Sequence, residues 1–461
     1  MDTTTAQRST LESELRARVR GEVIGRDHAE YDRARAVWNG LVDRHPSLIV
    51  RCVDTDDVVA CVEAAARHRP PVSIRGGGHQ VAGSAVCDDG LVIDLSRMRG
   101  VRVDPVARLA RVQGGALWQD VDAATQVHGL ATPGGEVSET GVAGLTLGGG
   151  LGLLQRAFGL ACDNVVSMEV VTADGVVRTA SAIENPDLFW TLRGAGRGVG
   201  VVTEFTFALH PVGPDVATAG FAFEAEDAAS VFAAWREVAL AAPESVAPEF
   251  ALWSLPPFAG LPEEFVGRSV ALAFGTFIGD PDDATPVLES FSRLGDPLLD
   301  LSGTSTWVET QSAYDPTLPA GARYYWKSHF VDDIDPATIA TLAEHASRRP
   351  DARCAVIVRT LGGAIDRVGP DGTAYAHRGA RFNVSIDGIW TDPALDEACI
   401  GWVRGLWSAL EPVSRGVYLN FAGFGEDGVR DRVLGRNARR VDRIRRAYDP
   451  DGLFDEAARQ P

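Results

Sequence analysis

The residues best suited to chemistry in this chain follow one short β-rich run. Gly76, Gly77 and Gly78 come directly after that run and lead to His79. Glycine lets the backbone take dihedral angles closed to other residues and lets it approach a ligand closely. A histidine at the end of such a turn could meet that ligand at covalent range, because a neutral imidazole nitrogen is a nucleophile. The same residues also fit a plain tight turn whose imidazole bonds a neighbouring carbonyl.

Two later segments place polar side chains at alternate positions. Tyr418 and Asn420 would share one face if their segment is a strand, and the tyrosine could then take a proton from a substrate or be a structural residue with a bonded hydroxyl. In the run 382–387, Asn383, Ser385 and Asp387 alternate with apolar residues. This polar face could line a substrate site, with Asp387 as the base or as the activator of Tyr418, or it could be a solvated outer face.

The single lysine, Lys327, excludes several cofactor classes. A Walker A phosphate loop needs a glycine-rich loop that ends in Lys-Ser or Lys-Thr, whereas Trp326 precedes the only Lys-Ser pair. A pyridoxal phosphate Schiff base could use only Lys327, whose neighbours do not indicate such a site. This lysine could lie at the substrate end of a site or on the surface. The six cysteines lack zinc-site spacing, so we expect buried free thiols and no metal.

Composition indicates a soluble globular protein. The 461 residues are 45% hydrophobic and 23% charged, which suits about two to three domains. No apolar run is long enough to span a membrane, and the start MDTTTAQRST has no secretory pattern, so we expect a cytoplasmic protein. The net charge of −19 argues against nucleic-acid binding. The basic run Arg436–Arg446 instead predicts an amphipathic helix with a solvated face.

The elements that must position these residues alternate between helices and strands in the first half of the chain. We expect helix through most of residues 1–45, and a helix over Thr55–Arg69 with Thr55 as its N-cap. Another helix is expected over Ala116–His128, and Asn185-Pro186-Asp187 opens a short one. The predicted strands, two of which form a hairpin around residues 173–175, are Leu48–Val53, Val72–Arg75, Leu91–Leu95, Val101–Val103, Ala110–Val112, Val165–Thr172, Val176–Ala180 and Val199–Leu209.

Pro211 and Pro214 mark a boundary, after which the pattern predicts a second α+β unit. We expect its residues, from about 216 to 410, to carry substrate contacts, and the tail from Tyr418 onward to pack against the first unit. The elements predicted in this unit are a helix over Glu226–Ala241 and strands over Val270–Phe277, Ala355–Leu361 and Phe382–Trp390.

Several glycine-rich loops in the first half suit an extended ligand better than a Rossmann turn. In Gly76–Val81 and in Gly194–Val199, valine stands where the dinucleotide fingerprint needs its last glycine or alanine. Further glycine pairs occur at 114–115 and 134–135. These loops together predict a long ligand whose diphosphate is held by backbone N–H groups.

Longer motifs occur in a defined order along nearly the whole chain: RGGGHQVAGSAVCDDGLVIDLSRM, TPGGEVSETGVAGLTLGGGLGLL, CDNVVSMEVVTADG, NPDLFWTLRGAG, VGVVTEF, YWKS, TAYAHR and a closing YLNF…YDPDGLF. Their order resembles the FAD-linked oxidases of the berberine bridge enzyme type, in the vanillyl-alcohol oxidase superfamily. The resemblance implies an α+β fold. A two-subdomain mixed α/β FAD-binding domain of the PCMH type, residues 1–215 completed by 411–461, would join a substrate domain, residues 216–410, with a large antiparallel sheet.

The resemblance also implies that His79 is bonded to the 8α carbon of FAD, which makes the flavin a stronger oxidant. Many relatives add a second link through a cysteine after the Pro-Gly-Gly turn. Val137 occupies that position here. We therefore predict a single link, as in the bacterial singly tethered branch of the family. Tyr418, Asp387 and Asn420 are the catalytic candidates. Thr140 and Leu145 would shape the oxygen pocket near the flavin N5. The full set of implied FAD contacts is His79, Arg75, Gly76, Gly77, Gly78, Gly83, Ser84, Pro133, Gly134, Thr140, Gly141, Gly144, Leu145, Gly149, Gly150, Asp163, Asn164, Val202, Tyr418 and Asn420.

Two departures from the relatives affect the flavin site. Gly196-Arg197-Gly198-Val199-Gly200 stands where they carry Gly-x-Asn-Phe-Gly, and DEAARQP follows Leu453-Phe454 where they carry Asn-x-Asn-Ile. These contacts of the relatives therefore lack counterparts here.

Three functions stay open at this point. The first is an oxidase that transfers hydride from a secondary-metabolite alcohol, amine or C–H centre to covalent flavin, with O2 as acceptor. The second is an oxygenase that uses a flavin–oxygen adduct to oxygenate or rearrange a polyketide-type intermediate. The third is a non-catalytic flavin-binding or carrier-binding protein. In each we expect a monomer or homodimer that binds a small molecule and contacts neither nucleic acid nor membrane.

Overall fold

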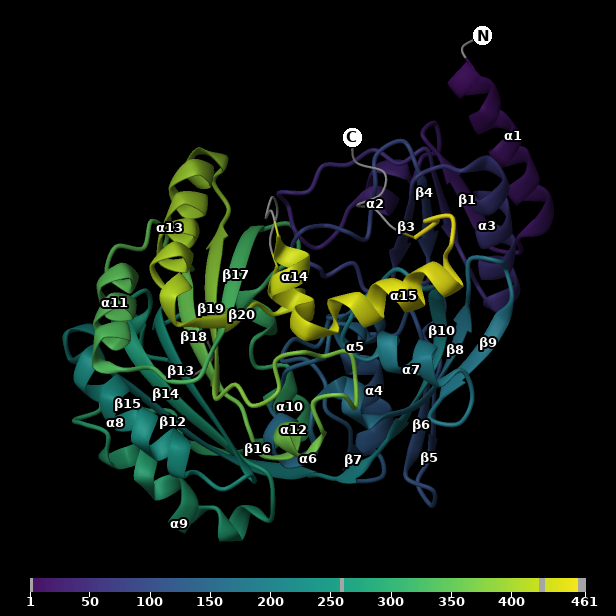
Figure 1. Cartoon of the computed structure of the whole chain (residues 1–461). Helices are drawn as coiled ribbons and strands as arrows, with labels where there is room; N and C mark the ends of the chain where they lie inside the picture. The colour runs from purple at the N-terminus through teal and green to yellow at the C-terminus, as the bar shows by residue number, and fades with distance from the viewer. Residues whose placement is uncertain (1–2, 258–260, 423–427, 455–461) are drawn as a thin grey trace.

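Four short strands carry the glycine turn in the computed structural model, which describes residues 3–257, 261–422 and 428–454 (Figure 1). Their order is β1 (Glu22–Gly25), β2 (Leu48–Arg51), β4 (Leu91–Asp94) and β3 (Val72–Arg75), and the last three are mutually parallel. The helices α1 (Thr3–Arg18) and α3 (Thr55–His68) pack against each other and against this sheet. The predicted strands of this region are confirmed.

Two details of the predicted N-terminal region are wrong. Residues 1–45 do not form a mainly helical segment, because β1 lies between α1 and the short helix α2 (Tyr31–Arg35). Val23 and Ile24 are buried and pair with β2, so this apolar pair forms a strand. The N-cap of α3 is Asp54, whose carboxylate accepts from the N–H of Asp57 at 3.0 Å, and the predicted cap Thr55 is the first helical residue.

A second, five-stranded antiparallel sheet follows, in the order β5, β6, β10, β8, β9. Its hairpin between β8 and β9 encloses residues 173–175 as predicted, and the helix expected over Ala116–His128 is present as α4. The short strands β7 (Leu130–Ala131) and β11 (His210–Pro211) form a separate ladder that leads toward the rest of the chain. The elements of this region are β5 (Val101–Asp104), β6 (Leu109–Gln113), α4 (Trp118–Gln126), α5 (Val142–Leu147), α6 (Gln155–Phe158), β8 (Val165–Val171), β9 (Val177–Ser181), α7 (Pro186–Leu192) and β10 (Val201–Ala208).

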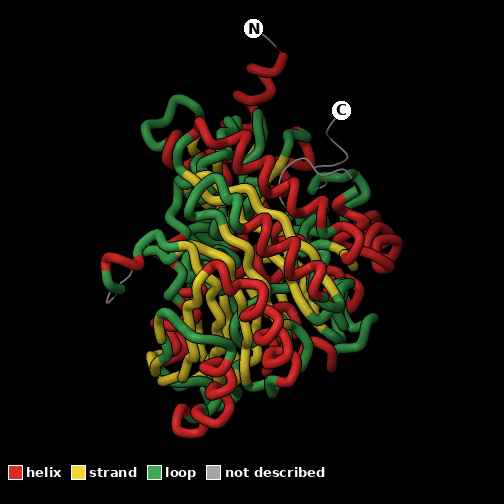
Figure 2. Tube along the Cα trace, turned by 90° about the vertical axis from the view of Figure 1, so that its left-hand side faces the viewer, coloured by secondary structure: helices red, strands yellow, loops and turns green. Residues whose placement is uncertain are grey.

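A nine-stranded antiparallel sheet forms the other half of the molecule, in the order β15-β12-β14-β13-β18-β19-β17-β20, with β16 also paired to β12. Its strands are β12 (Asp215–Glu224), β13 (Val246–Ser254), β14 (Ser269–Phe277), β15 (Leu299–Asp300), β16 (Gly303–Thr306), β17 (Arg323–Val331), β18 (Ala355–Thr360), β19 (Phe382–Trp390) and β20 (Ser414–Gly416). Figure 2 shows strands side by side through the middle of the molecule with helices around them. The mixed helix-and-sheet class with a large antiparallel sheet is confirmed.

Three helices cover one face of this sheet: α8 (Ala228–Ala241), α11 (Pro336–Ala346) and α13 (Asp396–Ala409) (Figure 1). The largest core cluster lies between them and the sheet, and includes Phe232, Trp235, Phe250, Phe382 and Trp390. Because helices and core fill this face, the opposite face of β13, β18, β19 and β17 is left for the site.

The C-terminal segment returns to the first half of the chain, as predicted. Helices α14 (Val429–Leu434) and α15 (Ala438–Tyr448) follow the large sheet, and α15 packs on α7. Val441 and Ile444 are buried on its inner side, so the predicted basic amphipathic helix is confirmed. Arg445 donates from it to the carbonyls of Ala195 and Arg197, at 3.2 and 2.7 Å. Among the described residues no helix combines the length and apolarity needed to cross a membrane.

Candidate functional site

A cavity of about 530 Å³ lies between the two halves of the molecule. The glycine turn after β3, the loop 135–145 and the loop 195–202 line it from the first half. The uncovered face of β13, β18, β19 and β17 lines it from the second half, and the segment 418–422 closes it. The cavity therefore brings together segments more than 300 residues apart in sequence, such as His79 and Tyr418.

The glycine turn is shaped by contact with a second glycine loop. A Cβ on Gly77 would meet the backbone nitrogen of Gly141 at 2.5 Å, so the two backbones pack directly against each other. Gly78 has φ +69°, in the left-handed region that favours glycine. Arg75, at the end of β3, is buried and donates to the carbonyls of Ala34 and Arg35. The turn therefore leaves a rigid strand end and delivers His79 to the cavity.

His79 reaches the cavity as a neutral imidazole. Burial lowers its pKa to about 4, and its buried Nε2 has no hydrogen-bond partner among the described residues. Unpaired buried polar atoms are rare because each one costs free energy. The imidazole is thus neutral, its Nε2 is unpaired, and the residue lies on the cavity wall.

Most of the predicted FAD contacts line this one cavity. The residues that the structure brings together there are His79, Gly76, Gly77, Gly78, Ser84, Thr140, Gly141, Gly144, Leu145, Val202, Tyr418 and Asn420, together with the catalytic candidate Asp387. The loop that departs from the relatives also lines it, through Gly196, Arg197, Gly198 and Gly200.

Eight predicted contacts do not line the cavity: Arg75, Gly83, Pro133, Gly134, Gly149, Gly150, Asp163 and Asn164. Two of them make contacts that hold neighbouring loops. Asp163 forms a buried ion pair with Arg378, and the amide oxygen of Asn164 accepts from Nε2 of His210 at 2.7 Å. Any role of these eight toward a cofactor stays a prediction. The predicted departure after Phe454 lies outside the described residues, whereas Phe454 itself lines the cavity.

Tyr418 and Asn420 meet in the site although their predicted strand is wrong. Strand β20 ends at Gly416, and residues Leu419–Phe421 form a 3₁₀ turn in which the N–H of Phe421 donates to the carbonyl of Tyr418 at 3.1 Å. The amide nitrogen of Asn420 then reaches back to the Tyr418 hydroxyl at 2.8 Å. A strand would have aligned these side chains along one face, whereas the turn makes them touch.

The hydroxyl oxygen of Tyr418 is surrounded by donors. It accepts from the N–H groups of Gly150 and Leu151, at 3.1 and 3.0 Å, as well as from Asn420. Burial raises the pKa of Tyr418 to about 12, while these three donors act in the opposite direction. Tyr418 is therefore protonated at neutral pH, and the three donors only partly offset the effect of burial.

The polar face of β19 is buried and not solvated. Asn383, Ser385 and Asp387 are all at most 5% exposed, and Asp387 lines the cavity. Burial raises the pKa of Asp387 to about 6, although Arg359 and the Ser385 hydroxyl, which donates to it, favour the carboxylate. Asp387 is consequently ionised at neutral pH, with a pKa close enough to neutrality for proton transfer.

Sequence reasoning missed a buried ion cluster beside Asp387. Arg359 of β18 binds Glu136 of the glycine loop through two nitrogens, at 2.6 to 3.0 Å, and lies 3.4 Å from Glu249 of β13. Burial raises the pKa of Glu249 well above its usual range. The sequence signal that could have found Arg359 is the alternation of side chains along β18, which places Arg359 on one face of the strand. Glu136 and Glu249 are remote from Arg359 in the chain, so no local pattern indicates that they meet.

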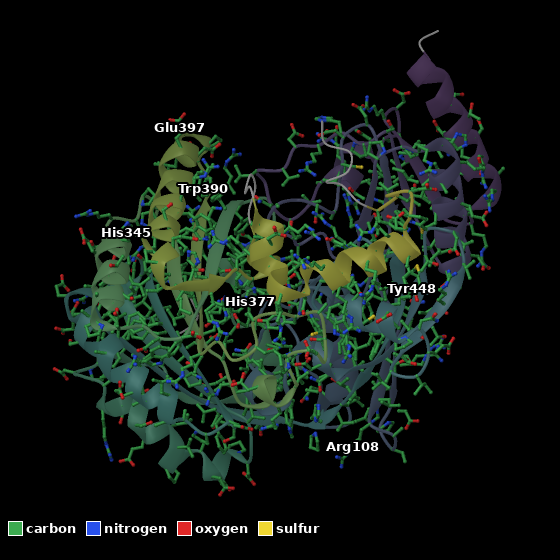
Figure 3. All side chains as sticks on the ribbon, in the orientation of Figure 1. Arg108, His345, His377, Trp390, Glu397 and Tyr448 are labelled. Carbon is green, nitrogen blue, oxygen red and sulfur yellow. The ribbon has the colours of Figure 1, made fainter. Side chains whose placement is uncertain are left out.

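Lys327 lies neither on the surface nor in the cavity lining. It is 3% exposed, and its ammonium sits 4.4 Å from the ring centre of Trp407. Trp407 belongs to α13, so Lys327 faces the helix-covered side of β17, while its neighbour Trp326 lines the cavity. On the opposite face of β17, His377 stacks on Phe330 at 4.9 Å, lies close to α14 (Figure 3) and bonds the carbonyl of Arg432 at 2.7 Å.

Comparison with known proteins gives a consistent result. A family model described as an FAD binding domain matches residues 46–181. The chain is 30% identical to an uncharacterized FAD-linked oxidoreductase, YgaK, of Bacillus subtilis, over 95% of this chain and 96% of that protein. It superposes on 6-hydroxy-D-nicotine oxidase from Arthrobacter nicotinovorans with a TM-score of 0.82 and 27% identity, over 95% and 96% of the two chains. It also shares the fold of glucooligosaccharide oxidase from Acremonium strictum, with a TM-score of 0.84 at 22% identity over 98% of both chains.

Proposed function

Since this chain belongs to the FAD-linked oxidoreductases of the berberine bridge enzyme type, we propose that it is an oxidase of a small secondary metabolite. It would oxidise an alcohol, an amine or an activated C–H centre. Bound FAD supplies the hydride acceptor and returns the two electrons to O2. Residues 1–215 with 411–461 would hold FAD, and residues 216–410 would hold the substrate.

The residues present fit FAD. Gly76, Gly77 and Gly141 line the cavity wall with backbone alone, and backbone N–H groups are what a diphosphate needs. A Cβ on Gly144 would meet no atom within 4 Å, so there is open space beside helix α5. The neutral, buried imidazole of His79 on the cavity wall is the single observation that carries the proposal, because a neutral imidazole can act as the nucleophile that a covalent link to a ligand needs.

We propose one covalent link, from His79 to the 8α carbon of FAD. Glucooligosaccharide oxidase, which has the same fold, is described with a 6-S-cysteinyl, 8α-N1-histidyl FAD. Val137 lines the cavity in the loop where the resemblance expects the second, cysteinyl link. A valine side chain cannot form that link.

Asp387 is the residue best placed to take a proton from the substrate. It lines the cavity, and its pKa of about 6 keeps it ionised at neutral pH. Tyr418 lines the same cavity, and its hydroxyl holds the N–H groups of Gly150 and Leu151 in place together with Asn420. These two residues would orient the substrate while Asp387 holds the proton.

The charges on the part of the cavity wall around β18 and β19 favour an uncharged or cationic substrate. Arg359 is balanced by Glu136, with which it forms a two-pronged pair, and Asp387 adds a further negative charge. An anionic substrate would be repelled by this arrangement. The neighbouring wall is aromatic and includes Trp253, Tyr314, Trp326 and Phe421, which suits a flat apolar body or an amine cation.

The test is to load the protein with FAD and screen candidate alcohols and amines for bleaching of the flavin absorbance without O2. Re-oxygenation should then release one hydrogen peroxide for each substrate consumed. Incorporation of ¹⁸O from ¹⁸O2 into the product, without peroxide, would favour the oxygenase instead. Absence of bleaching by all substrates would favour a non-catalytic binding protein.

A further inference from the structure

Three aromatic rings are stacked behind the glycine turn. The imidazole of His79 lies 4.1 Å from the indole of Trp38, with 20° between the ring planes. The other face of Trp38 lies 3.6 Å from the ring of Tyr324, at 17°. Both Trp38 and Tyr324 are buried. Trp38 is therefore fixed between the histidine of one half of the molecule and strand β17 of the other.

Hydrogen bonds hold Trp38 on both sides. Its N–H donates to the carbonyl of Gly78 at 3.2 Å, and its indole Nε1 donates to the carbonyl of Leu318 at 3.0 Å. The N–H of Gly321 donates to the Trp38 carbonyl at 2.8 Å. These bonds join the glycine turn directly to the segment before β17, so the indole has little freedom to rotate.

Asn39 reinforces the same junction. Its amide nitrogen donates to the carbonyls of Val81 and Tyr324, at 2.6 and 2.8 Å, and its amide oxygen accepts from the N–H of Tyr324 at 3.0 Å. Val81 follows His79 by two residues. The pair Trp38 and Asn39 thus ties the residues on both sides of His79 to β17.

The orientation of the imidazole depends on this stack. Nε2 has no hydrogen-bond partner among the described residues, and the hydrogen bond that the imidazole makes with the backbone of His79 itself leaves the tilt of the ring to its neighbours. The indole face instead determines the plane in which the imidazole lies. It also covers one ring face, which contributes to the burial that keeps the imidazole neutral.

We propose that Trp38, backed by Tyr324, is a positioning residue for formation of the covalent link between His79 and FAD. The inference rests on the proposed link. In that step the imidazole nitrogen forms an N–C bond to the 8α carbon, and one hydrogen of that carbon leaves as a proton. The electron pair of the broken C–H bond stays with the flavin and then passes to O2, which becomes hydrogen peroxide by taking up this proton and the N–H proton that the imidazole loses. Trp38 contributes only the orientation of the nitrogen.

The test compares Trp38→Phe with Trp38→Leu, which are both apolar but differ in having a flat ring. Flavin-free protein is mixed with FAD in air, and samples are denatured over time to measure the fraction of flavin that stays with the polypeptide. Trp38→Phe should form the link within about threefold of the wild-type rate. Trp38→Leu should bind FAD but form the link about tenfold more slowly, which corresponds to about 1.4 kcal/mol, the upper range for an aromatic pair.

Trp402→Ala is the matched control. Trp402 is a partly buried tryptophan of α13 that also donates its Nε1 to a carbonyl, that of His345 at 2.9 Å, and it does not line the cavity. This variant should form the link at the wild-type rate. If Trp38→Leu does not fold, Tyr324→Leu, which removes the ring behind Trp38, should slow the link as well.

The outcomes separate the two proposals. A wild-type protein that holds FAD without any covalent link overturns the link and this inference together. If the wild-type protein forms the link, this inference alone is overturned when Trp38→Leu forms it as fast as Trp38→Phe. It is also overturned when Tyr324→Leu forms the link as fast as the wild type. A slow link in the leucine variant with an unchanged amount of bound FAD supports it.

Discussion

Replacing Asp387 by asparagine (Asp387→Asn) should lower activity and raise stability together. Burial raises the pKa of Asp387 from its ordinary value of 3.8 to about 6. The folded protein then binds this proton more tightly than the unfolded chain, so the free energy of unfolding falls as pH rises from about 4 to about 6 and stays lower above that range. A shift of about 2 units corresponds to about 3 kcal/mol. Asparagine removes the buried charge, and we expect it to recover about 1–3 kcal/mol at pH 8.

The activity should change in the opposite direction. If Asp387 takes the substrate proton, kcat/KM of the wild type falls tenfold per pH unit below about pH 6, where the carboxylate becomes protonated. The variant should be slower by about 10²- to 10⁴-fold, the usual contribution of a general base, and should lack this acidic limb. Urea unfolding at pH 4 and pH 8, and flavin reduction by substrate over the same range, measure the two effects.

The matched control is Asp56→Asn, because the Asp56 side chain is 94% exposed. It should change the free energy of unfolding by less than about 0.5 kcal/mol. It should leave the pH profile of kcat/KM unchanged. A raised pKa of Asp387 and its role as the base are refuted if Asp387→Asn destabilises the protein equally at both pH values, or if the variant keeps the acidic limb of the wild type.

Three further predictions follow from the same contacts. Tyr418→Phe leaves the N–H groups of Gly150 and Leu151 without their acceptor; urea unfolding should show a loss of about 2–4 kcal/mol, and a loss below about 0.5 kcal/mol would contradict these bonds. Arg359→Met leaves the buried Glu136 carboxylate without its partner and should cost about 3–5 kcal/mol, whereas Glu249→Gln should cost less because burial raises the pKa of Glu249 and so already disfavours its charged form; equal costs in thermal unfolding would refute this. The rate of covalent attachment should be constant from pH 9 down to about 5 and fall below about pH 4, as the His79 imidazole becomes protonated; attachment that slows already at pH 6.5 would show an unshifted histidine.

The sequence predicted the parts of the fold that depend on local patterns. The strand Val72–Arg75 and the strand Phe382–Trp390 have the predicted bounds, because alternating apolar residues and flanking glycines mark them locally. The glycine turn could also be predicted, since three consecutive glycines before a histidine have few structural explanations.

The remaining site depends on contacts between distant segments. Glu136 and Arg359 pair across 223 residues, so neither side chain carries a local signal of the other. Tyr418 and Asn420 alternate as a strand would, but pairing of β20 ends at Gly416 and the chain turns. Trp38 was visible only as an apolar residue of an expected helix, whereas its stacking on His79 requires the assembled fold.

The most direct test of the account is mass spectrometry of the flavin-loaded protein after trypsin digestion. Cleavage after Arg75 and Arg97 releases the peptide 76–97, which contains His79 as its only histidine. We predict that this peptide carries the mass of one FAD, with the modification on His79, and that the peptide containing Val137 carries none. An unmodified 76–97 peptide from protein that holds stoichiometric flavin, or flavin attached at another residue, would contradict the central claim.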